Sequence, residues 1–142
     1  TSDVIELVNH KIQQAYQLIQ EPLIVEDSGL FFDAWNELPG ALVKWFEKSV
    51  GCLGMLKMLS SFDQRKAVAL CCVAYHDGQN VEIFQGRVRG VIAEEPLGKN
   101  GFGWDAIFIP HGYDKTFAQM NSIEKNIISH RRRALEKFKD SF

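Results

Sequence analysis

Cysteine is scarce in this sequence of 142 residues, which contains only Cys52, Cys71 and Cys72. Their number is odd, and no spacing among them matches a zinc site or a redox Cys-x-x-Cys pair. Cys71 and Cys72 stand in an apolar segment and are expected to point to opposite faces of a strand. We therefore expect three reduced thiols and a cytoplasmic location.

Long apolar runs and an excess of one charge are also missing. No segment approaches the roughly 20 apolar residues that a membrane helix requires, so no membrane partner is expected. The 16 basic and 18 acidic residues give a net charge of −2, which argues against a nucleic-acid partner. Arg131, Arg132 and Arg133 nevertheless gather near Lys125 and His130, and such a local cluster suits a small anionic ligand.

Several common catalytic motifs are absent as well. The sequence has no GxGxxG dinucleotide motif, Walker loop, GxSxG elbow or HExxH zinc motif. It does have an ordinary globular composition, with 46% hydrophobic and 24% charged residues. A chain of this length and composition fits a single domain over residues 1–142.

The hydrophobic pattern predicts a mixture of helices and strands. A helix is predicted over 3–20, because apolar residues recur there at helical spacing and Pro22 ends it. The clearest strands form a hairpin, 67–75 and 81–91, around a turn at 76–80. The mixture indicates an α/β or α+β domain with flanking helices on a mixed sheet. The remaining predicted elements are strands at 23–25, 30–33 and 106–109 and helices at 41–48, 51–60 and 122–140.

Two adjacent carboxylates, Glu26 and Asp27, follow the predicted strand 23–25. Ligands usually bind at strand ends in an α/β sheet, and Mg²⁺ prefers carboxylate oxygens. Gly29 would let the backbone come close to such a ligand. The alternative is that Asp27-Ser28-Gly29 is only a turn.

The segment Gly101-Phe102-Gly103-Trp104-Asp105 places two aromatic rings among glycines. Such rings offer a flat surface on which a base can stack, with backbone groups nearby for hydrogen bonds. The alternative is a tight turn whose aromatic side chains belong to the core.

The charge of Arg131 requires an explanation. On an ideal helix over 122–140 it lies on the apolar face, and a buried arginine needs an anion. That anion is either a carboxylate of the fold or a phosphate of a ligand. His130, on the flank of the same face, is expected to be half exposed. Lys11 poses a similar choice, because its stem can cover apolar surface or its charge can point into a cleft.

These segments together resemble the inosine triphosphate pyrophosphatase family. Each is weakly specific alone, but they occur in the family's order over nearly the whole chain. The matching stretches are Val25-Glu26-Asp27-Ser28-Gly29-Leu30, Leu38-Pro39-Gly40, Lys44-Trp45-Phe46, Phe84-Gln85-Gly86, Phe102-Gly103-Trp104-Asp105, Lys115-Thr116-Phe117-Ala118, Glu124-Lys125-Asn126 and Ser129-His130-Arg131.

The resemblance implies a two-lobed mixed α/β fold with a nucleotide cleft between the lobes. It also implies Mg²⁺-dependent hydrolysis of ITP, dITP or XTP between the α- and β-phosphates, giving a monophosphate and pyrophosphate. Mg²⁺ and the attacking water are expected at Asp27, with Glu26 as a second carboxylate. The other expected substrate contacts are Lys11, Ser28, Lys44, Phe102, Gly103, Trp104, Asp105, Lys125, His130 and Arg131, with Phe102 stacking on the base.

The sequence departs from the family pattern at two places. Gln119 stands where the family often has a glutamate. The family's first strand, its Thr-x-Asn-x-x-Lys phosphate loop, the following helix and strand and a metal-binding glutamate have no counterpart, so the resemblance is to a member without its N-terminal segment. An unpaired sheet edge there predicts a homodimer, in which a second copy covers the edge. Nucleotide binding without hydrolysis and a dimeric scaffold are the alternative functions.

Overall fold

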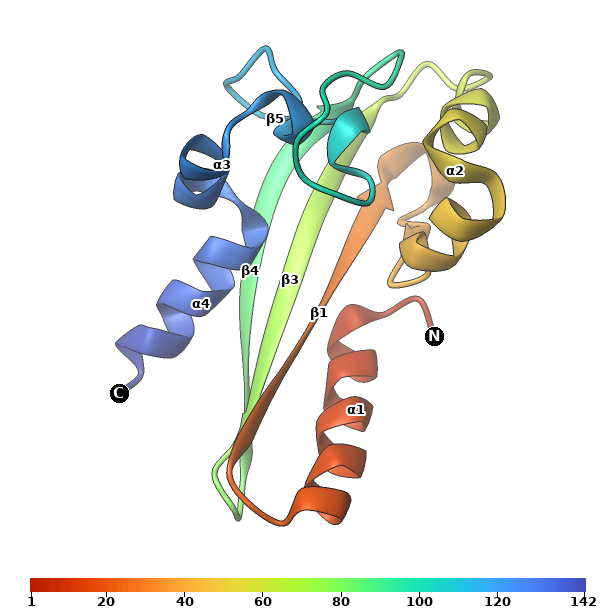
Figure 1. Ribbon diagram of the computed structural model, residues 1–142. Coiled ribbons are helices and arrows are strands. Elements are labelled where there is room, and N and C mark those ends of the chain that lie inside the picture. Colours follow the sequence, from red (N-terminus) through yellow and green to blue (C-terminus); the bar gives the residue numbers. More distant parts are fainter.

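The computed structural model describes residues 1–142 as one sheet with helices on both sides (Figure 1). This arrangement confirms the predicted α/β fold. Three 3₁₀ turns, at Asp33–Trp35, Asp105–Ile107 and Phe117–Gln119, connect the longer elements. In chain order these are α1 (Val4–Ile19), β1 (Leu23–Phe32), β2 (Pro39–Gly40), α2 (Val43–Leu59), β3 (Lys66–His76), β4 (Val81–Ile92), β5 (Phe108–Pro110), α3 (Ser122–Ile128) and α4 (His130–Asp140).

The sheet has the strand order β2-β1-β3-β4-β5. Every neighbouring pair is antiparallel, so the prediction of a mixed sheet is wrong. The predicted hairpin is confirmed as β3 and β4, which pair along their whole facing length. The outer strands are short, since β2 pairs only with Leu30 and Phe31 and β5 only with residues 90–92. The first part of β1, Leu23 to Gly29, is therefore paired on one side only.

Strand β1 is continuous where the sequence predicted two short strands, so the predicted strand end at Asp27 is wrong. All its residues pair with β3, from Leu23 opposite His76 to Phe32 opposite Ala67. Pairing with a long apolar neighbour overrides the local turn preference of Asp-Ser-Gly.

Gly29 makes room for other parts of the fold. A Cβ at this position would meet Val4 Cγ2 at 2.7 Å and the backbone of Gly40 at 2.9 Å. The residue lets the start of α1 and strand β2 approach β1, so the expectation that it makes room for a ligand is wrong.

The first two helices follow their sequence signals. Asp3 accepts hydrogen bonds from the Ile5 and Glu6 amides and so begins α1, and Gln20 ends it in a left-handed conformation. The predicted break at Gly51 is confirmed, since its backbone leaves helical geometry within α2 (φ 70°, ψ 177°). None of the helices is both long and apolar enough to cross a membrane.

The predicted last helix is two helices separated at Ser129. This residue has extended geometry (φ −66°, ψ 155°), and its side chain accepts a hydrogen bond from the Arg132 amide. It therefore ends α3 and caps α4. A helical wheel drawn through Ser129 assigns the wrong faces to the residues that follow it.

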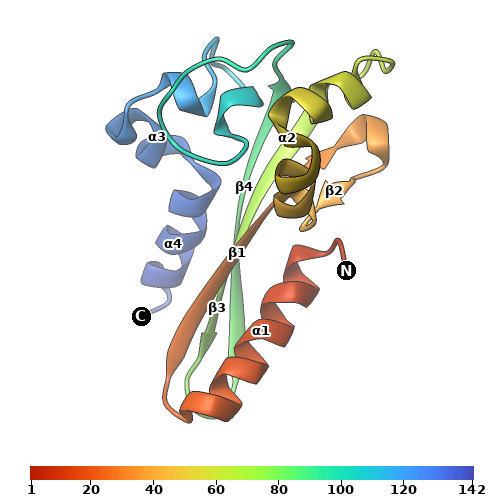
Figure 2. The same ribbon diagram turned by 45° about the vertical axis from the view of Figure 1, so that its right-hand side comes forward.

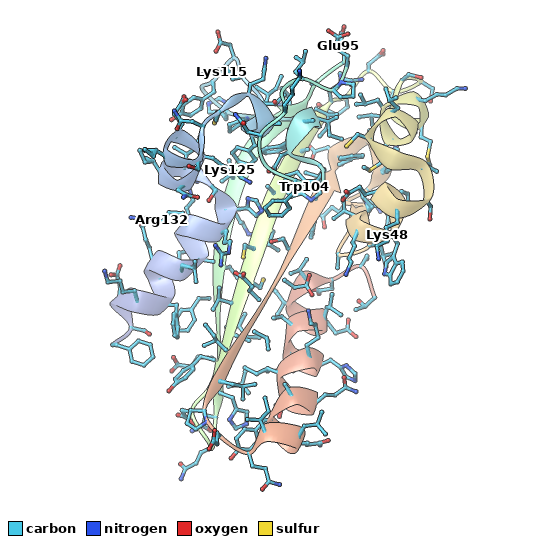
Figure 3. All side chains as sticks on the ribbon, viewed as in Figure 1. Lys48, Glu95, Trp104, Lys115, Lys125 and Arg132 are labelled. Carbon is cyan, nitrogen blue, oxygen red and sulfur yellow. The ribbon has the colours of Figure 1, made fainter.

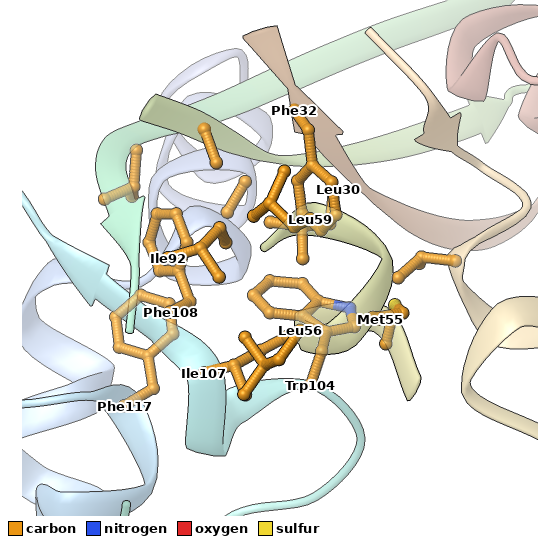
Figure 4. Close-up of a cluster of buried hydrophobic side chains, with 14 of the residues drawn as sticks. Leu30, Phe32, Met55, Leu56, Leu59, Ile92, Trp104, Ile107, Phe108 and Phe117 are labelled. Atoms are coloured by element: carbon orange, nitrogen blue, oxygen red, sulfur yellow. The ribbon is translucent and has the colours of Figure 1, made fainter. Parts of the chain in front are cut away.

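Hydrophobic clusters lie on both faces of the sheet. The largest packs the sheet's upper part against α2 and the segments around β5, and Trp104 lies among its buried side chains (Figure 4). Helix α1 covers one face of the lower part with Val4, Val8 and Ile12. Helix α4 covers the opposite face (Figures 1 and 2). The long strands therefore join two ends of the molecule, one covered by α2 and the segments around β5 and the other by α1 and α4.

Candidate functional site

A cleft of about 690 Å³ lies between β1, α2, the segment before β5 and the junction of α3 with α4. Every residue predicted for the site except Lys11 lines this cleft, and Lys11 contacts one of them. The expectation that these residues share one concavity is confirmed. The lining residues are Glu26, Asp27, Ser28, Val43, Lys44, Glu47, Lys48, Phe102, Gly103, Trp104, Asp105, Lys125, Asn126, Ser129, His130 and Arg131.

A second hollow, of about 730 Å³, lies between β4 and α4. Its lining includes Arg87, Arg133 and Lys137 but none of the residues predicted for the site. The two hollows are therefore similar in volume but differ in the residues that line them. Only the first cleft combines carboxylates, lysines and an exposed aromatic ring.

Asp27 is held at the cleft by two hydrogen bonds. Lys11 Nζ donates to its Oδ2 at 2.7 Å, and the amide of Ser28 donates to its Oδ1 at 3.0 Å. A quarter of the Asp27 side chain is exposed. Lys11 therefore directs its charge toward Asp27, and the carboxylate has a fixed direction.

Arg131 pairs with a carboxylate of the fold. Its Nε donates to Glu26 Oε1 at 2.9 Å and to Oε2 at 3.0 Å, and 60% of the Arg131 side chain is exposed. The expectation that Arg131 lies on a buried apolar face is wrong, because α4 begins anew at His130 and turns the following residue toward β1.

Glu26 and Asp27 do not converge as paired metal ligands. Successive strand residues point to opposite faces, and accordingly Glu26 meets Arg131 of α4 while Asp27 meets Lys11 of α1. No group of three or more His, Cys, Asp or Glu side chains is placed to hold a metal ion. Of these two carboxylates, Asp27 is the one expected to meet Mg²⁺, which is commonly bound by one or two carboxylates together with waters and substrate phosphates.

The two aromatic rings of the segment before β5 have different environments. Phe102 is 81% exposed at the cleft, whereas Trp104 is buried in the largest hydrophobic cluster. The core interpretation therefore holds for Trp104, and the stacking role of Phe102 stays a prediction. Phe102 is free to stack on a ligand, and Trp104 anchors the segment to the core.

Asp105 connects this segment to α3. It is buried, and its Oδ2 accepts hydrogen bonds from the Phe102 amide at 3.1 Å and from Lys125 Nζ at 2.5 Å. Lys125 Nζ also lies 4.8 Å from the centroid of the Phe102 ring. Phe102 and Lys125 are therefore positioned together by one carboxylate. Figure 3 labels Lys125 and also Trp104, which precedes Asp105 in the chain.

His130 is buried, so the expectation that it is half exposed is wrong. Its ring lies 5.2 Å from the Trp104 ring and 5.9 Å from the Phe117 ring, between centroids. Burial, with the charge of Lys125 adding to it, lowers the pKa of His130 from 6.5 to about 4. The imidazole is therefore neutral at pH 7, and its Nδ1 has no hydrogen-bond partner.

Two charged residues of the cleft were missed by the sequence prediction. Glu47 and Lys48 line it from α2 together with Lys44. They follow Lys44 by three and four residues, the spacing of side chains on one helix face. The helical spacing from Lys44 therefore indicates that Glu47 and Lys48 lie on the same side of α2 as Lys44.

Comparisons with known proteins identify relatives of this chain. A family model described as the Ham1 family matches residues 1–141. Inosine triphosphate pyrophosphatase from Scheffersomyces stipitis is 45% identical over 95% of this chain and 70% of its own length. dITP/XTP pyrophosphatase from Thermococcus kodakarensis is 45% identical over 94% of this chain and 72% of its own length.

Solved structures show the same fold. The Ham1 protein of Staphylococcus aureus has a TM-score of 0.84 and 32% sequence identity, over 90% of this chain and 70% of that protein. A HAM1 protein from Coxiella burnetii has a TM-score of 0.77 and 33% identity, over 85% of this chain and 66% of that protein. The chain thus spans about two thirds to three quarters of the length of its relatives.

Proposed function

The chain belongs to the Ham1 family, and from that premise we propose that it hydrolyses the purine nucleoside triphosphates ITP, dITP and XTP to monophosphate and pyrophosphate. Relatives 45% identical are named inosine triphosphate pyrophosphatase and dITP/XTP pyrophosphatase. The observation that carries the proposal is the cleft itself. It combines an exposed aromatic ring, Phe102, with a fixed carboxylate, Asp27, and with an unpaired lysine, Lys44, for the phosphates.

The cleft residues divide into two groups with different tasks. Phe102 offers the stacking surface for the base, beside Lys125, His130 and the backbone of Gly103 and Asp105. At the other end, Asp27 accepts the proton of the attacking water as the anhydride between the α- and β-phosphates is cleaved. Lys44 attracts the phosphates, since it is exposed and pairs with no carboxylate. Positioning and neutralisation of charge supply most of the catalysis of phosphoryl transfer.

Mg²⁺ is the proposed cofactor. When bound, it neutralises the charge that develops on the phosphates. Asp27 would hold it together with substrate oxygens, while Lys11 and the Ser28 amide keep the carboxylate in place. Glu26, engaged by Arg131 on the other face of the sheet, is not proposed as its second ligand.

Pyrophosphate release tests the function directly. With Mg²⁺ present, ITP, dITP and XTP should be hydrolysed with kcat/KM at least about tenfold above that for ATP. Asp27→Asn should reduce kcat by about 100-fold or more, because general-base catalysis alone contributes about 10²–10⁴. Asp63→Asn, an exposed position outside the cleft lining, is the matched control.

Two results would contradict this assignment. Equal rates with ITP and ATP would remove the base selection. Tight binding of ITP without release of pyrophosphate would leave nucleotide binding as the function.

We also propose a two-fold homodimer in the cytoplasm. The residues Leu23 to Gly29 of β1 form an edge paired on one side only, and Ile24 is half exposed on it. A second copy pairing with this edge antiparallel satisfies both edges at once. The three free cysteines, Cys52, Cys71 and Cys72, suit a reducing compartment.

A further inference from the structure

One carboxylate of the cleft has no partner. Four acidic residues line the cleft, and three of them pair with a basic side chain: Asp27 with Lys11, Glu26 with Arg131 and Asp105 with Lys125. The fourth, Glu47, makes no ion pair and no hydrogen bond. It is partly buried on α2, so a hydrogen-bond donor that enters the cleft finds a free acceptor there.

Glu47 lies beside the segment that holds the aromatic ring. A Cβ added to Gly103 would come within 3.3 Å of Glu47 Oε2. Cys52, on the same helix, donates from Sγ to the carbonyl oxygen of Gly103 at 3.6 Å. Burial raises the pKa of the Cys52 thiol, and the charges of Glu47 and Asp105 raise it further. The free carboxylate therefore adjoins the residue that follows Phe102.

The neighbours of Glu47 do not supply the missing donor. Lys44 stands one turn before it without approaching to ion-pair distance, and Lys48 Nζ lies over the Trp45 ring, 5.3 Å from the centroid. A base stacked on Phe102 would lie next to Gly103, the residue that adjoins Glu47. A ligand edge is thus the remaining source of a donor.

A carboxylate distinguishes purine edges by their donors, because it only accepts hydrogen bonds. Hypoxanthine and xanthine carry an N–H at N1, which donates to such an acceptor. Adenine carries a lone pair at N1, and its donor on this edge is the amino group at N6, so a carboxylate placed at N1 meets no proton there. A site built to pair one pattern leaves its buried polar groups unpaired with the other.

We propose that Glu47 is a specificity-determining residue that accepts the N1–H of 6-oxopurine bases and disfavours adenine. This inference rests on the proposed function, since it names the group that selects among the substrates of that cleft. It assigns the selection to α2, which lines the cleft together with Lys125 and His130.

Glu47→Gln tests the assignment, because the amide keeps the size of the side chain and adds a donor for adenine N1. The ratio of kcat/KM for ITP to that for ATP is measured in the wild type and the variant. It should fall about tenfold or more, with a loss for ITP and a gain for ATP. Glu95→Gln, an exposed change outside the cleft lining marked in Figure 3, should leave the ratio unchanged.

The outcomes separate this inference from the proposed function. A wild type that selects ITP over ATP, with an unchanged ratio in Glu47→Gln, overturns the role of Glu47 alone. Equal losses for ITP and ATP also overturn it, since they place Glu47 against the ribose or the phosphates. A wild type without selectivity contradicts both. If the chain binds nucleotides without hydrolysis, dissociation constants of IMP and AMP by calorimetry give the same ratio.

Discussion

Most cationic groups around the cleft are already engaged by the protein. Lys11, Lys125 and Arg131 each pair with a carboxylate, and the ammonium of Lys48 lies over an aromatic ring. Lys44 has no such partner. A phosphate that enters the cleft therefore meets Lys44 as a free cation, whereas the three pairs serve mainly to hold their carboxylates in position.

The Lys125–Asp105 pair should stabilise the fold more than a surface pair does. Its side chains are 17% and 6% exposed, against 43% and 44% for Lys115 and Glu124. Lys125→Met leaves a buried carboxylate uncompensated, which should lower the free energy of unfolding by about 3 kcal/mol. Lys115→Met, the matched control, should cost below about 1 kcal/mol. Urea denaturation at pH 7 measures both, and equal losses would contradict a buried pair.

His130 should make stability depend on pH. Its pKa is about 4 in the folded protein, below the ordinary 6.5, so the unfolded chain binds a proton more readily between these values. The resulting stability is fully present above pH 6.5 and is lost as the pH falls toward 4. At about 1.4 kcal/mol per pH unit, the loss reaches about 3 kcal/mol.

The His130→Gln variant isolates this contribution. Its free energy of unfolding, measured by urea denaturation from pH 7 to pH 4, should fall less steeply than that of the wild type. Carboxylates titrate alike in both proteins, so the difference between the slopes reports His130. Parallel curves would show that the imidazole is not held neutral.

At the level of elements, local sequence signals predicted a helix or strand correctly where its conformation does not depend on pairing with a distant segment. The first helix, the interruption of the second helix near Gly51 and the β3–β4 hairpin each follow from residues within a few positions. The continuity of β1 depends on β3, some 40 residues away, and pattern alone does not contain that pairing. Ser129 could have been recognised as a cap, but the periodicity on both sides of it favoured one long helix.

These two differences account for the errors within the site. The cleft and nearly all of its residues could be predicted from the family motifs. The directions of Glu26 and Asp27 could not, because they follow from a strand that continues through both. The positions of His130 and Arg131 could not either, because the break at Ser129 resets the faces of α4.

Gly86 sets the distance between β4 and α4. A Cβ at this position would collide with the carbonyl oxygen of His130 and the amide nitrogen of Ala134. Gly86→Ala should therefore displace α4 and destabilise the fold by about 1–3 kcal/mol. Arg89→Ala, an exposed position on the same strand, should cost below about 0.5 kcal/mol. Thermal unfolding compares them, and equal melting temperatures would show that α4 is not packed so closely.

At the level of the whole molecule, the free edge of β1 predicts self-association. Sedimentation at micromolar concentration should give a dimer. Ile24→Lys places a charge on this edge and should weaken the dimer about tenfold or more, since charged residues block strand pairing. Ile123→Lys, at an exposed isoleucine of α3, should leave it intact. A wild-type monomer, or equal effects of the two changes, would contradict pairing through β1.

The long ladders of the sheet also give the molecule a mechanical asymmetry. Residues 26–28, the cleft's contribution from β1, lie in the middle of a strand bonded to β3 along its whole length, and β3 is bonded in turn to β4. Bending β1 at these residues would strain many hydrogen bonds at once, so this side of the cleft is rigid. The opposite wall is a helix interrupted at Gly51 and a glycine-containing segment. Any change in the width of the cleft therefore comes from movement of α2 and residues 101–105. A ligand of the wrong thickness displaces these two segments and leaves β1 in place.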